Sequence, residues 1–106
     1  MPANATVLYP AESDATFDMA YYLKTHMPLV YEKWAKYGLT GWEVIEFAPG
    51  PDGSKPYSVA GVLHWESADN IGKAMGGEET AAVMEDVKNF SNKSPVFLIG
   101  NVVGTS

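Results

Sequence analysis

Apolar residues between positions 17 and 37 recur at steps of three and four residues, which predicts an amphipathic helix with one continuous apolar stripe. The stripe consists of Phe17, Ala20, Leu23, Met27, Val30, Trp34 and Tyr37. We expect the helix to begin near Thr16 or Phe17 and to end at Gly38, a residue type that suits a C-terminal cap. Pro28 lies in its middle, where a proline costs roughly 3 kcal/mol because it removes a hydrogen bond and clashes with an earlier carbonyl. The sequence therefore predicts either a kink at Pro28 or a second helical piece that starts there.

Four segments have the β-branched and aromatic character of strands: Val7-Leu8-Tyr9, GWEVIEF (41–47), YSVAGVLHW (57–65) and PVFLIGNVVG (95–104). Turn formers between the second and third segments predict an antiparallel hairpin. A second helical region is expected from the N-cap Ser67 to Phe90, with an interruption at Gly76-Gly77. The order βαββαβ predicts a single domain, residues 1–106, with an α+β, ferredoxin-like fold. In that fold a four-stranded antiparallel sheet carries its helices on one face.

The predicted strands are apolar on both faces. Alternation along residues 57–65 puts Leu63 and Trp65 on one face, and Val62 and His64 on the other. A sheet with one solvated face normally alternates apolar with polar residues, so the second face needs a cover. The chain has no further element to supply it. We therefore expect a homodimer in which a second copy of the sheet covers this face.

Charge and composition narrow the kinds of ligand. The chain has 13 acidic residues against seven basic ones, every basic residue is Lys, and the net charge is −6. Proteins that bind nucleic acids usually present a basic patch in which Arg contacts phosphates or bases. Bidentate binding of phosphate or carboxylate also favours Arg. We expect no nucleic-acid partner, and a ligand that is small and apolar.

Other absences point to an ordinary cytoplasmic protein without cofactors. The chain has no Cys, which fits a reducing compartment. It has no apolar run near the roughly 20 residues needed to span a bilayer, and its start does not resemble a signal peptide. Neither an HExxH motif nor a Gly-rich nucleotide loop is present, so we expect no metal, flavin or other cofactor.

His26 is the residue most suited to chemistry. It borders the apolar stripe, and imidazole titrates near neutral pH, which makes it the commonest general acid or base. The alternative is structural: its ring would bond a backbone carbonyl that Pro28 leaves without a partner, or it would cap a shortened helix. The hydroxyls of Tyr21 and Tyr22, one turn earlier, could orient a ligand. For His64 we favour a structural role, and for Asp86 we favour a position on a solvated helix face.

The segments YPAESDATFDMAYYLKTHMPLVYEKWAKYGLTGWEV, VLHWESADNIGKAM and EDVKNFSNKSPVFLIGNVV together resemble the EthD family, named for ethyl tert-butyl ether degradation. The resemblance covers nearly the whole chain and rests on YYLxxHMPLV in its ordered context. It implies a dimeric α+β barrel, built from two ferredoxin-like protomers. It also implies that His26 borders a cleft as the catalytic residue. Further ligand-binding candidates at that cleft are Tyr22, His64, Trp65, Asp86 and Phe90.

The resemblance implies less about activity. Superfamily relatives include cofactor-free monooxygenases, isomerases, polyketide dehydratases and cyclases, and haem proteins. The first hypothesis is an enzyme in which His26 moves a proton on a hydrophobic carbonyl or aromatic metabolite, as an oxidoreductase, isomerase or dehydratase. The alternative is a non-catalytic accessory or ligand-binding protein of an oxygenase or degradation pathway. A haem-handling role would use His26 or His64 as the iron ligand, and the lack of Arg for the propionates argues against it.

Overall fold

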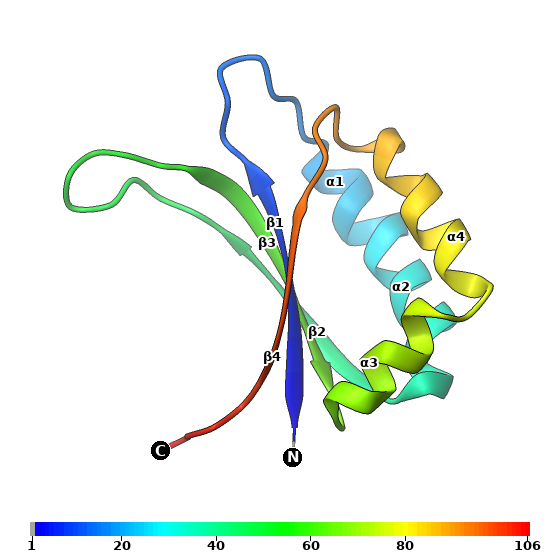
Figure 1. Cartoon of the computed structure of the whole chain (residues 1–106). Helices are drawn as coiled ribbons and strands as arrows, with labels where there is room; N and C mark the ends of the chain where they lie inside the picture. Colours follow the sequence, from blue (N-terminus) through cyan, green and yellow to red (C-terminus); the bar gives the residue numbers. More distant parts are fainter. Residues whose placement is uncertain (1) are drawn as a thin grey trace.

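A four-stranded antiparallel sheet carries all the helices on one of its faces (Figure 1). The structure, a computed structural model, describes residues 2–106. The strands, in the spatial order β2-β3-β1-β4, are β1 (Ala3–Pro10), β2 (Leu39–Glu46), β3 (Tyr57–Trp65) and β4 (Val96–Asn101). The helical pieces are α1 (Met19–Tyr21), η1 (Tyr22–His26), α2 (Met27–Trp34), η2 (Ala35–Tyr37), α3 (Ala68–Met75), α4 (Glu79–Glu85) and η3 (Asp86–Asn89). The predicted α+β, ferredoxin-like fold with an antiparallel β2–β3 hairpin is confirmed.

The first helical region accommodates Pro28 by changing its hydrogen-bond pattern. It begins at Met19, later than predicted, because the Asp18 side chain caps it by accepting a hydrogen bond from the Tyr21 N–H. The piece η1 is a π-helix, and the N–H of Met27 donates to the carbonyl of Tyr22, five residues earlier. Pro28 then lies in the first turn of α2, where a missing N–H costs little. Of the two predicted alternatives, the second helical piece is the correct one.

The far end of this region is set by Gly38. Its φ of 106° is in the left-handed region, and its N–H donates to the carbonyl of Ala35 at 3.1 Å. A side chain at this position would be strained, so glycine is the residue that fits. The chain then enters β2 directly, and Leu39 pairs with Trp65 of β3. The predicted helix end at Gly38 is confirmed.

The core lies between the helices and the near face of the sheet. On β1 the small residues Ala3 and Ala5 are fully buried and leave room for helices to approach. Their partners across β3 are Trp65 and Leu63, which share the same face. The buried apolar residues that pack together here also include Met27, Val30, Trp34, Leu39, Val59, Ile71, Ala74 and Val83. Each large side chain buried in this way contributes roughly 1.5–3 kcal/mol to the hydrophobic stabilisation of the fold.

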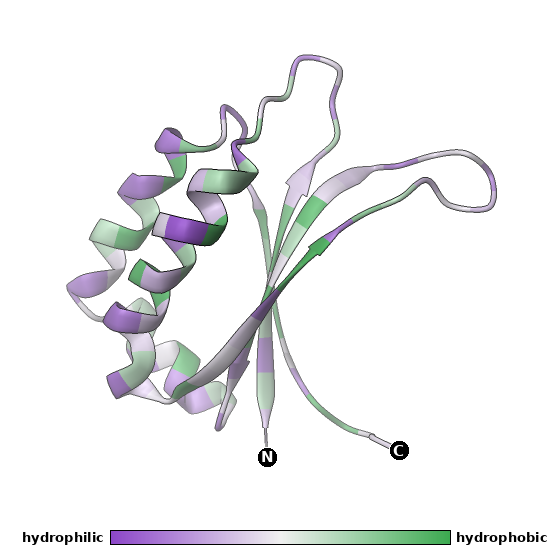
Figure 2. Ribbon diagram, turned by 180° about the vertical axis from the view of Figure 1, so that it is seen from behind, coloured by the Kyte–Doolittle hydropathy of each residue, from purple (hydrophilic) through white to green (hydrophobic). Residues whose placement is uncertain are grey.

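The opposite face of the sheet is bare, and much of it is apolar. Leu98 of β4 is 52% exposed and Ile45 of β2 is 41% exposed, while Val62 in the central strand β3 is half-buried. Figure 2 shows hydrophobic positions along the strands, although helices cover only one face. No helix within residues 2–106 has both the length and the apolar character to cross a bilayer. The two-faced apolar character inferred for the strands is therefore present in the structure.

Gly61 of β3 lets a tyrosine reach the sheet. A Cβ atom built at this glycine would collide with the hydroxyl oxygen of Tyr22, whereas it would lie 3.6 Å from the ring carbon Cζ, an ordinary contact. The bare Cα of Gly61 therefore accommodates the hydroxyl and not the ring. At Gly41, a glycine of the neighbouring strand β2, a built Cβ has no atom within 4 Å.

We predict that Gly61→Ala lowers the free energy of unfolding by about 1–3 kcal/mol, because overpacking displaces Tyr22. Tyr22→Phe in the same chain should recover most of that loss, since it removes the colliding oxygen. Gly41→Ala is the matched control and should have little effect. Urea unfolding of the four variants checks this, and additive effects of Gly61→Ala and Tyr22→Phe would contradict the contact.

Candidate functional site

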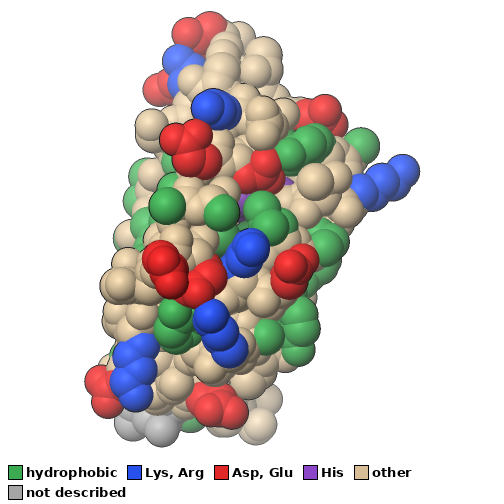
Figure 3. Space-filling view, turned by 90° about the vertical axis from the view of Figure 1, so that its right-hand side faces the viewer, with side chains coloured by type: hydrophobic (Ala, Val, Ile, Leu, Met, Phe, Trp, Pro, Cys, Tyr) green, Lys and Arg blue, Asp and Glu red, His purple; other side chains and the backbone are tan. Residues whose placement is uncertain are grey.

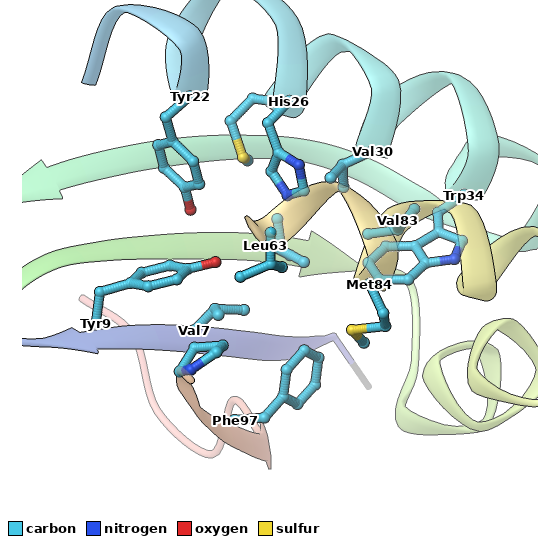
Figure 4. Close-up of a pocket in the computed structure, with 13 residues that line it drawn as sticks. Val7, Tyr9, Tyr22, His26, Val30, Trp34, Leu63, Val83, Met84 and Phe97 are labelled. Atoms are coloured by element: carbon cyan, nitrogen blue, oxygen red, sulfur yellow. The ribbon is translucent and has the colours of Figure 1, made fainter. Parts of the chain in front are cut away.

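A cleft lies between the helices and the sheet, with His26 in its wall (Figure 4). About 390 Å³ of space not filled by protein atoms lies in and in front of it, open solvent included, so the cleft itself is narrow. Its lining residues are Val7, Tyr9, Tyr22, His26, Met27, Val30, Trp34, Leu63, Val83, Met84, Val87, Pro95 and Phe97. Most of these are apolar, as is usual for sites that bind small molecules. Figure 3 shows the helix side of the molecule, where hydrophobic side chains gather around a small area of histidine.

The π-helical turn and two aromatic rings position His26. The residue closes η1, directly before the proline-containing helix α2, and only 4% of it is exposed. Its imidazole stacks on the ring of Tyr22, with centroids 5.5 Å apart and planes 13° from parallel. Phe90 packs on it at 4.5 Å. In Figure 4 the ring points from the helix toward Leu63 on the sheet. These contacts hold the imidazole in one orientation in the cleft wall.

One ring nitrogen of His26 is bonded to Asp86. The distance between Nδ1 and the carboxylate oxygen Oδ2 is 2.9 Å. The other oxygen, Oδ1, accepts from the Tyr21 hydroxyl at 2.5 Å and from the Asn89 amide at 2.9 Å. An ionised carboxylate only accepts, so neutral His26 carries its proton on Nδ1. The lone pair of Nε2 is then free to accept a proton or a hydrogen bond.

This partner replaces the one expected for a structural histidine. A structural role predicted that the ring would bond a backbone carbonyl freed by Pro28, and the structure shows a carboxylate from the last helical piece instead. The Tyr21 hydroxyl, which was a candidate for orienting a ligand, donates to Asp86 instead and so helps to hold the carboxylate beside His26. Asp86 is therefore part of a hydrogen-bonded group and not a solvated helix acid.

The surroundings set the protonation states of the two groups. Burial lowers the pKa of His26 below its ordinary value of 6.5, and the hydrogen bond and charge of Asp86 offset only part of that effect. Burial raises the pKa of Asp86, but hydrogen bonds from Tyr21, Asn89 and His26 together outweigh it and leave that pKa below its usual value. At neutral pH the pair is a neutral imidazole beside an ionised carboxylate.

The structure brings together four of the six predicted site residues. Tyr22 and His26 line the cleft, Asp86 holds His26, and Phe90 packs behind the imidazole. His64 lies on the opposite face of the sheet, where its ring nitrogens bond Asn4 and Glu43 at 3.1 and 3.2 Å.

Trp65 faces the helices but is buried beside Trp34, with ring centroids 5.8 Å apart, and it does not line the cleft. Two physical causes separate these residues from His26. Alternation along β3 turns His64 to the other face, and the length of the strand carries Trp65 past the cleft to its far end. Both therefore lie outside the cleft in which the resemblance had placed them.

Two side chains at this cleft were not among the predicted site residues. Tyr9 lines the cleft from β1, and Asn89 donates to Asp86. The signal for Tyr9 was available, because Ala3, Ala5, Val7 and Tyr9 alternate along one face of β1. Asn89 lies three residues after Asp86, a spacing at which helical side chains meet. Within residues 2–106 no group of three or more His, Asp or Glu side chains is arranged to hold a metal ion.

The His26–Asp86 pair should make stability depend on pH. Because folding lowers the pKa of His26, the unfolded chain binds more protons between the folded pKa and about 6.5. We predict that the free energy of unfolding falls as pH decreases through this window, and that His26→Gln makes the dependence flatter there. His64→Gln is the control and should retain the contribution of His26. Urea unfolding at fixed protein concentration measures it, and an unchanged slope in His26→Gln would contradict it.

Solved EthD-like proteins are similar to this chain in sequence and fold. An EthD-like protein from Ralstonia eutropha JMP134 is 28% identical with a TM-score of 0.86, and the match covers 99% of this chain and 95% of that one. An ethyl tert-butyl ether (EthD) family protein from Bacillus halodurans C-125 is 23% identical with a TM-score of 0.76, and the match covers 97% and 100% of the two chains.

A more distant structure shares the fold. This dimeric ferredoxin-like protein of unknown function from Thermobifida fusca is 11% identical, with a TM-score of 0.61 over 96% of this chain and 92% of that one. No protein-family model matches the chain, and no curated protein matches it either. The near full-length similarity to the Ralstonia protein, at the highest of these identities, agrees with the motifs around His26 and Pro28. The recognition of this chain as EthD-like is therefore confirmed.

Proposed function

We propose that the protein binds a small, largely apolar carbonyl or aromatic compound in the cleft and that His26 transfers a proton to or from it. The observation that carries this proposal is the placement of the imidazole. Its Nδ1 bonds Asp86, which leaves Nε2 as the nitrogen able to accept a proton in a cleft with mostly apolar walls. A general base needs a free lone pair, a pKa not far from neutrality and reach to its substrate.

The same group explains how the proton would be held after transfer. When Nε2 takes a proton from a carbon next to a carbonyl, the C–H electron pair moves into an enolate and His26 becomes an imidazolium. The ionised Asp86 at 2.9 Å from Nδ1 then stabilises the positive charge. Returning the proton to another atom completes an isomerisation or precedes a dehydration. The geometry supports this proton step, which several reactions share.

We predict that the protein accelerates exchange of the α-hydrogens of 1-tetralone, an apolar bicyclic ketone, for deuterium in D₂O. Positioned acid–base groups typically contribute 10²–10⁴-fold, so His26→Gln should lower the catalysed rate by about 100-fold or more. Asp86→Asn should lower it by a comparable factor, because Tyr21 and Asn89 hold the amide oxygen and turn the amide N–H toward Nδ1, which moves the His26 proton to Nε2. Proton NMR follows the loss of the α-hydrogen signal.

His64→Gln is the matched control, since it removes the histidine on the other face of the sheet, and its rate should equal that of the wild type. Binding of 1-tetralone, measured by protein-observed NMR shifts, should change less than threefold in His26→Gln. If the wild type binds the ketone but exchanges its hydrogens at the solution rate, the catalytic part of the proposal fails. The protein is then a binding or accessory protein.

We also propose that two copies pack sheet against sheet. The bare face of the sheet exposes Ile45, Val96 and Leu98, and no part of residues 2–106 covers it. Sheets that pack face to face lie about 10 Å apart and interdigitate such side chains. The structurally similar Thermobifida protein is dimeric, which supports the same arrangement here. The result would be the dimeric α+β barrel that the sequence resemblance implies.

We predict a dimer at micromolar concentration, and we predict that Leu98→Asp shifts it to a monomer because a carboxylate would be buried against the partner sheet. Leu23→Asp is the control: Leu23 is 41% exposed in the helical layer, on the other side of the sheet. Light scattering measures the mass of each variant. A wild-type monomer with intact secondary structure would contradict this proposal.

A further inference from the structure

We infer that Tyr9 and Tyr22 form an oxygen-binding end of the cleft, whose two hydroxyls donate hydrogen bonds to an oxygen atom of the ligand. The ligands selected are then apolar ring compounds with one carbonyl or phenolic oxygen, and hydrocarbons of the same shape bind less well. This inference rests on the proposed function, because it concerns the same cleft. It assigns a role to Tyr9, which was not among the predicted site residues.

The two tyrosines come from different layers and meet at one end of the cleft. Tyr9 stands on β1 and Tyr22 on η1, and their rings pack edge to face with centroids 5.7 Å apart. The Tyr22 hydroxyl lies over the bare Cα of Gly61 on β3. In Figure 4 the hydroxyl oxygens of Tyr9 and Tyr22 lie at the same end of the cleft, and the Tyr9 hydroxyl points into it. One ligand oxygen placed there would be near both.

Neither hydroxyl is used by the protein. Within residues 2–106, the hydroxyls of Tyr9 and Tyr22 form no hydrogen bond with the protein. The hydroxyls of Tyr21 and Tyr37, in contrast, donate to Asp86 and Glu79. Both tyrosines are only 2% exposed, so little solvent reaches either hydroxyl. A ligand oxygen in the cleft would supply the acceptor that the protein does not.

The hydroxyls are open to the cleft and remain protonated. Among residues 2–106, one side-chain polar atom is both fully enclosed and without a hydrogen-bond partner, and it is Nε1 of Trp65. The hydroxyl oxygens of Tyr9 and Tyr22 have no partner either, but they are not fully enclosed. Burial raises the pKa of both tyrosines, and the neighbouring Tyr22 raises that of Tyr9 further. At neutral pH they are therefore donors, suited to an oxygen that carries or develops negative charge.

The rest of the cleft defines the remainder of the ligand. Beyond the tyrosines its walls are apolar and include Leu63, Val83 and Phe97. His26 is the remaining titratable group that lines it, and its free Nε2 is an acceptor. A ligand oxygen at the tyrosine end would therefore leave an apolar ring system along the sheet. For a ketone, the α-carbon would be the part offered to His26, so that the tyrosines would stabilise the enolate oxygen formed by proton removal.

The test compares 2-naphthol with naphthalene, two fluorescent probes of nearly equal shape that differ by one hydroxyl group. The wild type should bind 2-naphthol about tenfold more tightly, since one or two hydrogen bonds contribute roughly 0.5–1.5 kcal/mol each. Tyr9→Phe and Tyr22→Phe should each weaken 2-naphthol binding about three- to tenfold and change naphthalene binding less than twofold. Tyr37→Phe, which removes a hydroxyl bonded to Glu79 outside the cleft, is the matched control and should change neither.

The outcomes separate this inference from the proposed function. If naphthalene binds in the cleft but the two phenylalanine variants bind 2-naphthol as tightly as the wild type does, the inference is overturned and the proposed function stands. If neither probe binds the wild type up to its solubility limit, both are overturned. Circular dichroism of each variant confirms that the fold is retained, and Tyr9 and Tyr22 provide two independent substitutions on different elements.

Discussion

The hydrogen bond between His26 and Asp86 joins the first helical region to the last, across 60 residues of chain. It fixes which ring nitrogen carries the proton, and so which one is available in the cleft. Tyr21 of the first helical region and Asn89 of the last bond the same carboxylate and so strengthen this connection. The tautomer of the imidazole and the proposed proton transfer depend on this one contact, whereas burial keeps the imidazole neutral.

Pro28 and the π-helical turn before it together determine where His26 lies. A regular helix through Pro28 would lose a hydrogen bond and clash with an earlier carbonyl. The additional residue in the π turn places the proline at the start of α2 instead, with His26 as the residue just before that helix. Single π turns inside helices are frequent at functional sites, where they reposition a side chain. The irregularity in the sequence is thus part of how the imidazole is presented.

The sequence was sufficient to predict the fold and the position of His26 beside the apolar stripe, because hydrophobic period, turn formers and caps are local signals. Ser67 and Gly38 cap helices as their types predict. The partner of His26 is a long-range contact, and nothing in the local pattern of Asp86 distinguishes it from a solvated acid. The exclusion of His64 from the cleft follows from the pleat, and alternation along β3 already placed His64 on the other face, although the resemblance put it at the cleft. The burial of Trp65 beside Trp34 depends instead on helix packing.

The central claim is that His26 at neutral pH is a neutral imidazole with its proton on Nδ1. Long-range ¹H–¹⁵N correlation spectroscopy of uniformly labelled protein at pH 7 reports the protonation of each ring nitrogen directly. We expect a protonated Nδ1 and an unprotonated Nε2 for His26, in agreement with the bond to Asp86. An imidazolium, or a proton on Nε2 with Nδ1 bare, would contradict the account.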